Sequence, residues 1–142
     1  MASFNKYQDF VEQLGLKTHN LNTDTLKVAL FNTSHVPAAT DTSYSSLANE
    51  VANGNGYTTG GSDAQGVWSE TGGVAKLTGT DIVFTASDGS ISNIRYAVLY
   101  NDTAAGKNLI GYWDYGAGGV TLADGETLTV DFDGTNGIAQ LS

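Results

Sequence analysis

The chain of 142 residues carries 15 acidic and 6 basic side chains, which give it a formal net charge of −9. This charge argues against nucleic acid and anionic membranes as partners, because neutralising phosphates requires clustered lysine and arginine. Cysteine is absent, so disulfides, thiolate chemistry and cysteine-bound zinc are excluded.

The length and composition predict one domain, residues 1–142, that is rich in β-strands. Glycine, threonine, serine, asparagine and aspartate are abundant, whereas the lysine and glutamate typical of long surface helices are scarce. No apolar run approaches the roughly 18 residues of a membrane span. The N-terminal MASFNKYQDF lacks the basic-then-apolar pattern of a secretion signal, so we expect a protein of the cytosol or of an assembly made there.

The N-terminal segment, residues 1–20, predicts an amphipathic helix over residues 3–14 followed by a connector. Ser3 is expected to cap the start of the helix, and Gly15 to end it in the left-handed conformation. Two interpretations remain open: the helix covers one end of the core, or its apolar side packs on a partner. The second interpretation gives four candidate partner-binding residues: Phe4, Tyr7, Phe10 and Val11.

Residues 26–32, LKVALFN, predict a strand with two apolar faces: Leu26, Val28 and Leu30 on one, Ala29 and Phe31 on the other. A short internal helix is expected from Asp41 or Thr42 to about Val51, where the glycines of NGNG stop it. Residues 53–74 then form a long stretch rich in glycine, serine and threonine, of the kind that often carries function. Tyr57 and Trp68 are its candidate partner-binding residues.

The most apolar part of the chain, residues 94–115, predicts a hairpin at the centre of a sheet. Its first half, IRYAVLY, is almost continuously apolar, which is typical of a strand covered on both faces. In its second half, LIGYWDY, alternation puts Leu109, Trp113 and Tyr115 on one side and Ile110 and Tyr112 on the other. The turn formers of NDTAAGKN join the two strands.

The remaining apolar runs are short and are separated by turn signals at intervals of about ten residues. In residues 127–133, Leu128, Val130 and Phe132 point inward, while Thr127, Thr129, Asp131 and Asp133 point outward. Strand spacing of this kind favours an antiparallel β-sandwich or jelly roll over residues 26–142, with the N-terminal helix and one short internal helix added.

The sequence offers little support for catalysis. His19 and His35 fall in polar connectors, and no G-x-S-x-G elbow is present. NGNGYTTGG has the glycines of a phosphate loop but no lysine after them. Asp114 between Trp113 and Tyr115 is compatible with a carbohydrate platform, but core aromatics beside one outward acid are the commoner arrangement.

Metal binding is also weakly supported. Five acids near turns could donate oxygen ligands to calcium: Asp114, Asp124, Glu126, Asp131 and Asp133. They lack the spacing of a calcium loop, and outward acids are common on acidic proteins. We therefore expect no metal, no cofactor and no enzymatic activity.

Three segments are similar to a family of small virion structural proteins of tailed bacteriophages, which includes head decoration proteins. These segments are LANEVANGNGYTTGG (47–61), IRYAVLYNDTAAGKNLIGYWDYG (94–116) and TLTVDFDGTNGIAQL (127–141). The resemblance covers roughly the last two-thirds of the chain. It rests on short sequences typical of strands and turns and includes no catalytic residue.

This resemblance implies a virion protein, assembled in the host cytoplasm, that binds the major capsid protein and has no catalytic activity. Self-association on the particle is a further expectation, and many repeated weak contacts would supply avidity. The alternative is a tail or fibre component that binds host-surface glycans, suggested by Trp68, Trp113 and the tyrosines.

Overall fold

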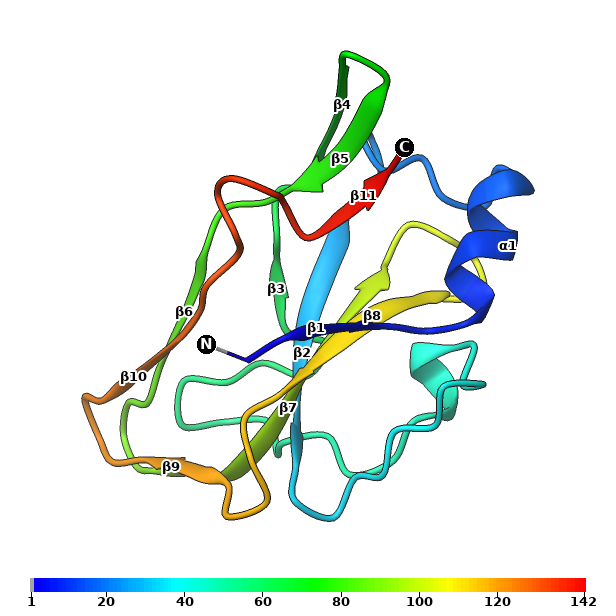
Figure 1. Ribbon diagram of the computed structural model, residues 1–142. Helices are drawn as coiled ribbons and strands as arrows, with labels where there is room; N and C mark the ends of the chain where they lie inside the picture. Colours follow the sequence, from blue (N-terminus) through cyan, green and yellow to red (C-terminus); the bar gives the residue numbers. More distant parts are fainter. Residues whose placement is uncertain (1) are drawn as a thin grey trace.

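The computed structural model describes residues 2–142, which are mainly β-strand in antiparallel sheets (Figure 1). Within that range there are one α-helix, α1 (Asp9–Gly15), and one 3-10 turn, η1 (Tyr44–Ser46), and neither has the length of a membrane span. The strands are β1 (Phe4–Lys6), β2 (Leu26–Asn32), β3 (Ser62–Asp63), β4 (Val67–Thr71), β5 (Val74–Thr78), β6 (Ile82–Thr85), β7 (Ile91–Asn101), β8 (Leu109–Asp114), β9 (Val120–Leu122), β10 (Thr127–Val130) and β11 (Ala139–Leu141).

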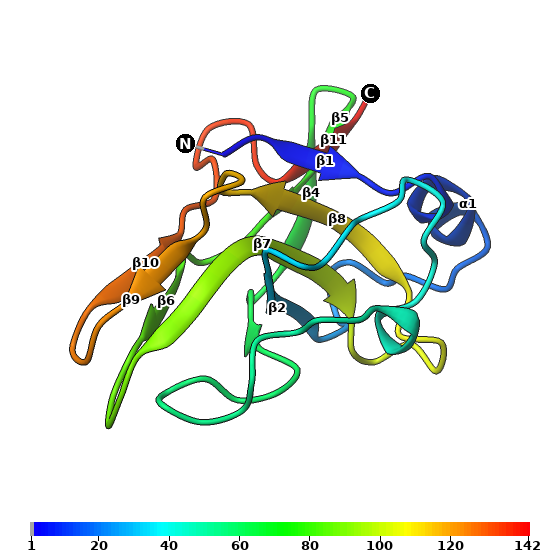
Figure 2. The ribbon, with the colours of Figure 1, turned by 90° about the horizontal axis from the view of Figure 1, so that it is seen from below.

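The strands form one large sheet and two small ones. The large sheet has six strands in the order β1-β8-β7-β2-β3, with β9 paired to part of β7. In the small sheets, β10 pairs with β6, and β5 lies between β11 and β4. Figures 1 and 2 show β6, β9 and β10 together at one end of the molecule and α1 at the other.

The central strand β7 is covered on both faces, as its continuous apolar run predicts. Ala97 and Leu99 belong to one buried cluster, and Val98 belongs to a second cluster on the opposite face. The first cluster is completed by side chains of the small sheets, such as Leu77 and Phe84, and we call this side the sheet-covered face. The second cluster is completed by three residues outside the strands, Tyr7, Tyr44 and Leu47. We call this side the loop-covered face.

A β-bulge in β8 changes which of its side chains share a face. Between Leu99 and Tyr100 of β7, the ladder advances by two residues on β8, which leaves Ile110 as the extra residue. Ile110 therefore lies on the sheet-covered face with Trp113, and Leu109 lies on the loop-covered face. The predicted alternation, with Ile110 opposite Trp113, is wrong for this reason.

The predicted helix over residues 3–14 is wrong in its first half, where the chain forms β1 and pairs with β8. Ser3 therefore caps nothing, and Gln8 holds the N-cap position of α1 without a side-chain hydrogen bond. The ring of Phe4 fits over Gly111, where a Cβ atom would lie within 2.1 Å of that ring. The missing side chain at Gly111 and the open edge of β8 together outweigh the helical pattern of the N-terminus.

The end of α1 also lies later than predicted. Lys17, not Gly15, takes the left-handed conformation, with φ of 66°. The amide of Thr18 bonds the carbonyl of Gln13, and the amide of Lys17 bonds that of Leu14, which is a Schellman motif shifted by two residues. The Thr18 hydroxyl also donates to the Gln13 side chain at 2.7 Å and holds the shifted end in place.

The predicted internal helix near residues 42–51 is reduced to the single turn η1, which Ser43 caps. Its backbone groups bond neighbouring chain segments instead of one another. The amide of Tyr44 bonds the carbonyl of Lys107, and the amide of Val51 bonds the carbonyl of Leu30 in β2. Pairing with existing elements therefore replaces the local helix here.

Candidate functional site

The structure separates the six predicted partner-binding residues into two groups. Tyr7, Phe10 and Tyr57 are buried in the core, and Phe4 is half-buried against Trp113, with ring centroids 5.2 Å apart. The exposed apolar stripe expected at the N-terminus is therefore not present. The other two residues remain at the surface: Val11, which is 54% exposed, and Trp68, which is half-buried.

Trp68 borders a region of the surface between the end of α1 and strand β4. A hollow of about 270 Å³ lies there. Leu14 of α1 lines it, and two apolar residues close to Leu14 in the chain are exposed: Val11, one helical turn earlier, and Leu16, at 63%. We call these four residues, Val11, Leu14, Leu16 and Trp68, the helix–hairpin surface. The hollow beside them is lined by Leu14, Lys17, His19, Asn20, Leu21 and Trp68.

A buried polar network supports the floor of this hollow. The Asn101 side chain is fully buried, and its oxygen accepts hydrogen bonds from the amides of Thr103 and Ala104. Its amide nitrogen donates to Asp24 Oδ2 at 2.7 Å and lies 3.1 Å from His19 Nδ1. The network ties the connector after α1 to the turn after β7.

The same network sets the protonation of His19. Because the Asn101 amide donates, His19 Nδ1 must accept, which places the imidazole proton on Nε2. Nε2 is buried without a hydrogen-bond partner, and burial lowers the pKa of His19 despite the opposing charges of Asp24 and Asp9. His19 is therefore a neutral group that supports the connector after α1.

A second network fixes the first part of the 53–74 stretch. Glu50 accepts hydrogen bonds from the Tyr44 and Tyr57 hydroxyls at 2.5 and 2.6 Å, and from the Gly60 amide at 2.7 Å. The Tyr57 oxygen in turn accepts the Leu30 amide. Burial, followed by the bond to Glu50, raises the pKa of Tyr57 far above its ordinary value. Each polar atom of this network has a hydrogen-bond partner, so the network holds the loop in place.

Four of the five acids considered for calcium accept hydrogen bonds from separate partners, and Asp131 is exposed. Asp114 forms a two-bond ion pair with Arg95, with both N–O distances at 3.0 Å, and this hydrogen bonding lowers the pKa of Asp114. Asp124 accepts the backbone amide of Asp88 from another turn, and Glu126 accepts the amide of Ala123 within its own turn. Across residues 2–142, no three histidine, aspartate or glutamate side chains are grouped so that they could hold a metal ion.

Sequence reasoning missed three residues that shape these regions: Leu16, Glu50 and Asn101. Leu16 follows the predicted end of the helix, and the shifted helix end leaves it exposed. Asn101 looks like an ordinary turn former, and Glu50 like a surface acid, because neither has a local pattern that signals burial. No family model, curated protein or solved structure matches the chain.

Proposed function

We propose that this protein is a non-enzymatic structural protein of a bacteriophage virion, and that it decorates the capsid by binding the major capsid protein. The observation that carries the proposal is that α1 and the residues after it leave Val11 and Leu16 in water, while Leu14 of the same segment lines a hollow with the half-buried Trp68. Exposed apolar side chains grouped around a hollow are typical of protein interaction sites. The likeness of the three segments to virion structural proteins supplies the partner.

The polar groups are consistent with an adhesive role. The Tyr57 and Asn101 side chains are hydrogen-bonded within the chain, and both histidines are buried. We also infer a sandwich-like arrangement, because side chains from the two small sheets join one face of the large sheet in a common core. Such a frame would hold α1 and β4 in a fixed relation, so that their shared surface is preformed for a partner.

The test uses purified particles that lack the protein and measures how many copies of each variant bind per particle. Leu16→Asp and Val11→Asp place a charge in the proposed interface. Burying one such apolar side chain contributes about 1.5–3 kcal/mol, so we expect capsid binding to weaken at least tenfold for each variant. The melting temperature should stay unchanged, because both side chains are largely exposed.

Val36→Asp is the matched control, because Val36 is 82% exposed and lies outside the helix–hairpin surface. Its capsid binding should equal that of the wild type. Absence of the protein from capsids, or equal binding of Leu16→Asp and Val36→Asp, would contradict the proposal.

The second candidate function is binding of host glycans by a tail or fibre component, and Trp68 is the residue that favours it. Trp113 gives it little support, because that ring is only 5% exposed. Localisation of the protein at tail tips by electron microscopy, together with glycan-dependent quenching of Trp68 fluorescence, would favour this function over capsid decoration.

A further inference from the structure

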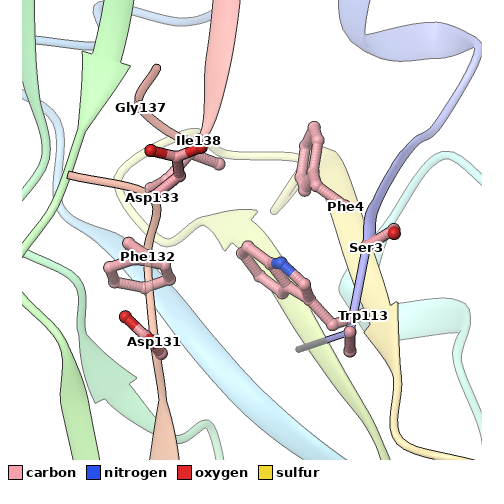
Figure 3. A pocket seen from close by; sticks show the side chains of 9 residues that line it. Ser3, Phe4, Trp113, Asp131, Phe132, Asp133, Gly137 and Ile138 are labelled. Atoms are coloured by element: carbon pink, nitrogen blue, oxygen red, sulfur yellow. The ribbon is translucent and has the colours of Figure 1, made fainter. Parts of the chain in front are cut away.

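A groove lies at the β1 edge of the large sheet, between β1 and residues 131–138, which join β10 to β11. Figure 3 shows Ser3 and Phe4 on one wall, Asp131, Phe132 and Asp133 on the other, and the Trp113 ring between them. The main hollow measures about 270 Å³, and a second hollow of about 230 Å³ adjoins it through Ala2, Trp113 and Asp131. We call this the aromatic groove, lined by Phe4, Trp113, Tyr115, Asp131, Phe132 and Ile138.

The groove exists because strand pairing stops on both sides of it. β1 is the last strand of the large sheet, and β10 and β11 are each the last strand of a small sheet. Trp113 spans the gap, with its ring centroid 5.2 Å from that of Phe4 and 5.5 Å from that of Phe132. The floor is therefore packed and apolar, while the outer edge of β1 has no strand partner within residues 2–142.

The groove wall also carries an uncompensated negative charge. Asp131 is exposed and takes part in none of the three salt bridges found in residues 2–142. Its charge acts on the neighbouring phenol: burial, with a contribution from Asp131, raises the pKa of Tyr115 to about 12. Asp133 is differently placed, because its carboxylate accepts hydrogen bonds from Thr135 and Asn136 in its own turn.

We propose that the aromatic groove binds an extended peptide segment of another protein, with an apolar side chain on the aromatic floor and a lysine or arginine beside Asp131. An unpaired strand edge next to an apolar groove is the arrangement by which proteins add a peptide strand to a sheet. Side chains two residues apart lie on the same side of such a strand, so the expected motif is apolar-x-basic. The groove is distinct from the helix–hairpin surface, so this inference does not depend on the virion role.

Charge complementarity selects this occupant over a second copy of the chain. The chain holds only 6 basic residues against 15 acidic ones, and Lys27, Arg95 and Lys107 are already in salt bridges. A carbohydrate is disfavoured because Trp113 is 5% exposed and its ring packs on Phe4 and Phe132, so it offers no open face for a sugar.

The first experiment selects binders from a random library of displayed dodecapeptides on the full-length protein. We expect enrichment of apolar-x-lysine or apolar-x-arginine. The same selection on Asp131→Lys should lose this motif and enrich acidic residues instead. Asp88→Asn is the control, because it removes one exposed charge in a distant turn where asparagine tolerates the positive φ of 62°.

The second experiment locates the binding site by nuclear magnetic resonance, using the indole N–H signals of the only two tryptophans. An enriched peptide should shift the Trp113 signal and leave the Trp68 signal unchanged. Asp131→Asn should weaken its affinity about tenfold, and Asp88→Asn should not change it.

Four outcomes would overturn the proposal: no enriched motif, an acidic motif on the wild type, a shift of Trp68 alone, or unchanged affinity in Asp131→Asn. A shift of Trp113 by a chito- or malto-oligosaccharide but by no peptide would assign the groove to carbohydrate. Failure here would leave the capsid-binding measurements with Leu16→Asp unaffected, because that variant lies on the other surface.

Discussion

The two faces of the large sheet are covered by different means. On the sheet-covered face, apolar side chains of β5, β6 and β10 pack on β2, β7 and β8. On the loop-covered face, residues 33–61 contribute only the partly buried apolar side chains of Tyr44 and Leu47. Tyr44 stacks on Tyr100, with ring centroids 4.2 Å apart, and Glu50 ties it to Tyr57, whose ring belongs to the sheet-covered cluster. Hydrophobic burial is nondirectional, whereas a buried hydrogen-bonding group that loses its partner costs its full desolvation free energy. The faces should therefore respond differently to substitution and to pH.

The largest effect is expected where the two faces meet in β7. Val98 is fully buried, so Val98→Asp would place an unpaired charge in a strand with no access to water. We expect this variant not to fold, as judged by loss of cooperative thermal melting. A soluble variant that melts cooperatively would contradict the assignment of β7 as a strand covered on both faces.

The next effect tests the loop-covered face. Glu50→Ala leaves the Tyr44 and Tyr57 hydroxyls and the Gly60 amide without their acceptor. Unmatched buried donors should lower the free energy of unfolding by about 3 kcal/mol, measured by urea denaturation. Hydrogen exchange should accelerate in residues 53–61 and not in β5 or β6. Glu12→Ala, on the exposed side of α1, is the control and should change stability by less than about 0.5 kcal/mol.

A smaller effect is expected at the edge of the sheet-covered face. Gly111→Ala would bring a methyl group within 2.1 Å of the Phe4 ring and 2.8 Å of the Asn5 carbonyl oxygen. Because Phe4 is only half-buried, we expect β1 to shift at a cost of about 1–2 kcal/mol rather than the fold to fail. Faster hydrogen exchange confined to β1 and β8 would confirm this, and unchanged exchange would contradict it.

The last effect is a response to acid. Burial lowers the pKa of both His19 and His35 below the ordinary value of 6.5. Below pH 6.5 the unfolded chain therefore binds more protons than the folded chain, so stability is retained above that pH and falls as the pH drops toward the folded-state values. The carboxyl groups with a lowered pKa change the stability only below their ordinary pKa of 3.8. The two histidines therefore account for most of the loss of stability between pH 6.5 and 5.

We expect this loss to be at most about 1.4 kcal/mol per histidine for each pH unit, measured by urea denaturation at pH 7 and pH 5. His35 packs on Phe31 and Tyr96 of the loop-covered face, with its Nε2 unpaired. His35→Gln should therefore remove about half of the acid sensitivity. An unchanged pH dependence would show that His35 is not a source of it.

The sites were predictable only in part. Val11 and Trp68 were identified as surface candidates from their segments, and Asp131 was identified as outward-facing from the alternation of residues 127–133. That Leu14 lies near Trp68, and Asp131 near Trp113, depends on the tertiary arrangement of the strands. Residues from distant parts of the chain meet at these surfaces, and a single sequence carries no local signal of which strands become neighbours.

The strands that could be predicted from the sequence are those whose apolar residues follow a regular local pattern. The two apolar faces of β2, the double burial of β7 and the alternation through Phe132 follow from a period of two residues, which any buried sheet requires. Tertiary structure decided the rest: the N-terminal strand in place of a helix, the loss of the internal helix, and the bulge at Ile110. In each case, backbone groups found better partners on a neighbouring element than in their own segment, and local periodicity cannot register that competition.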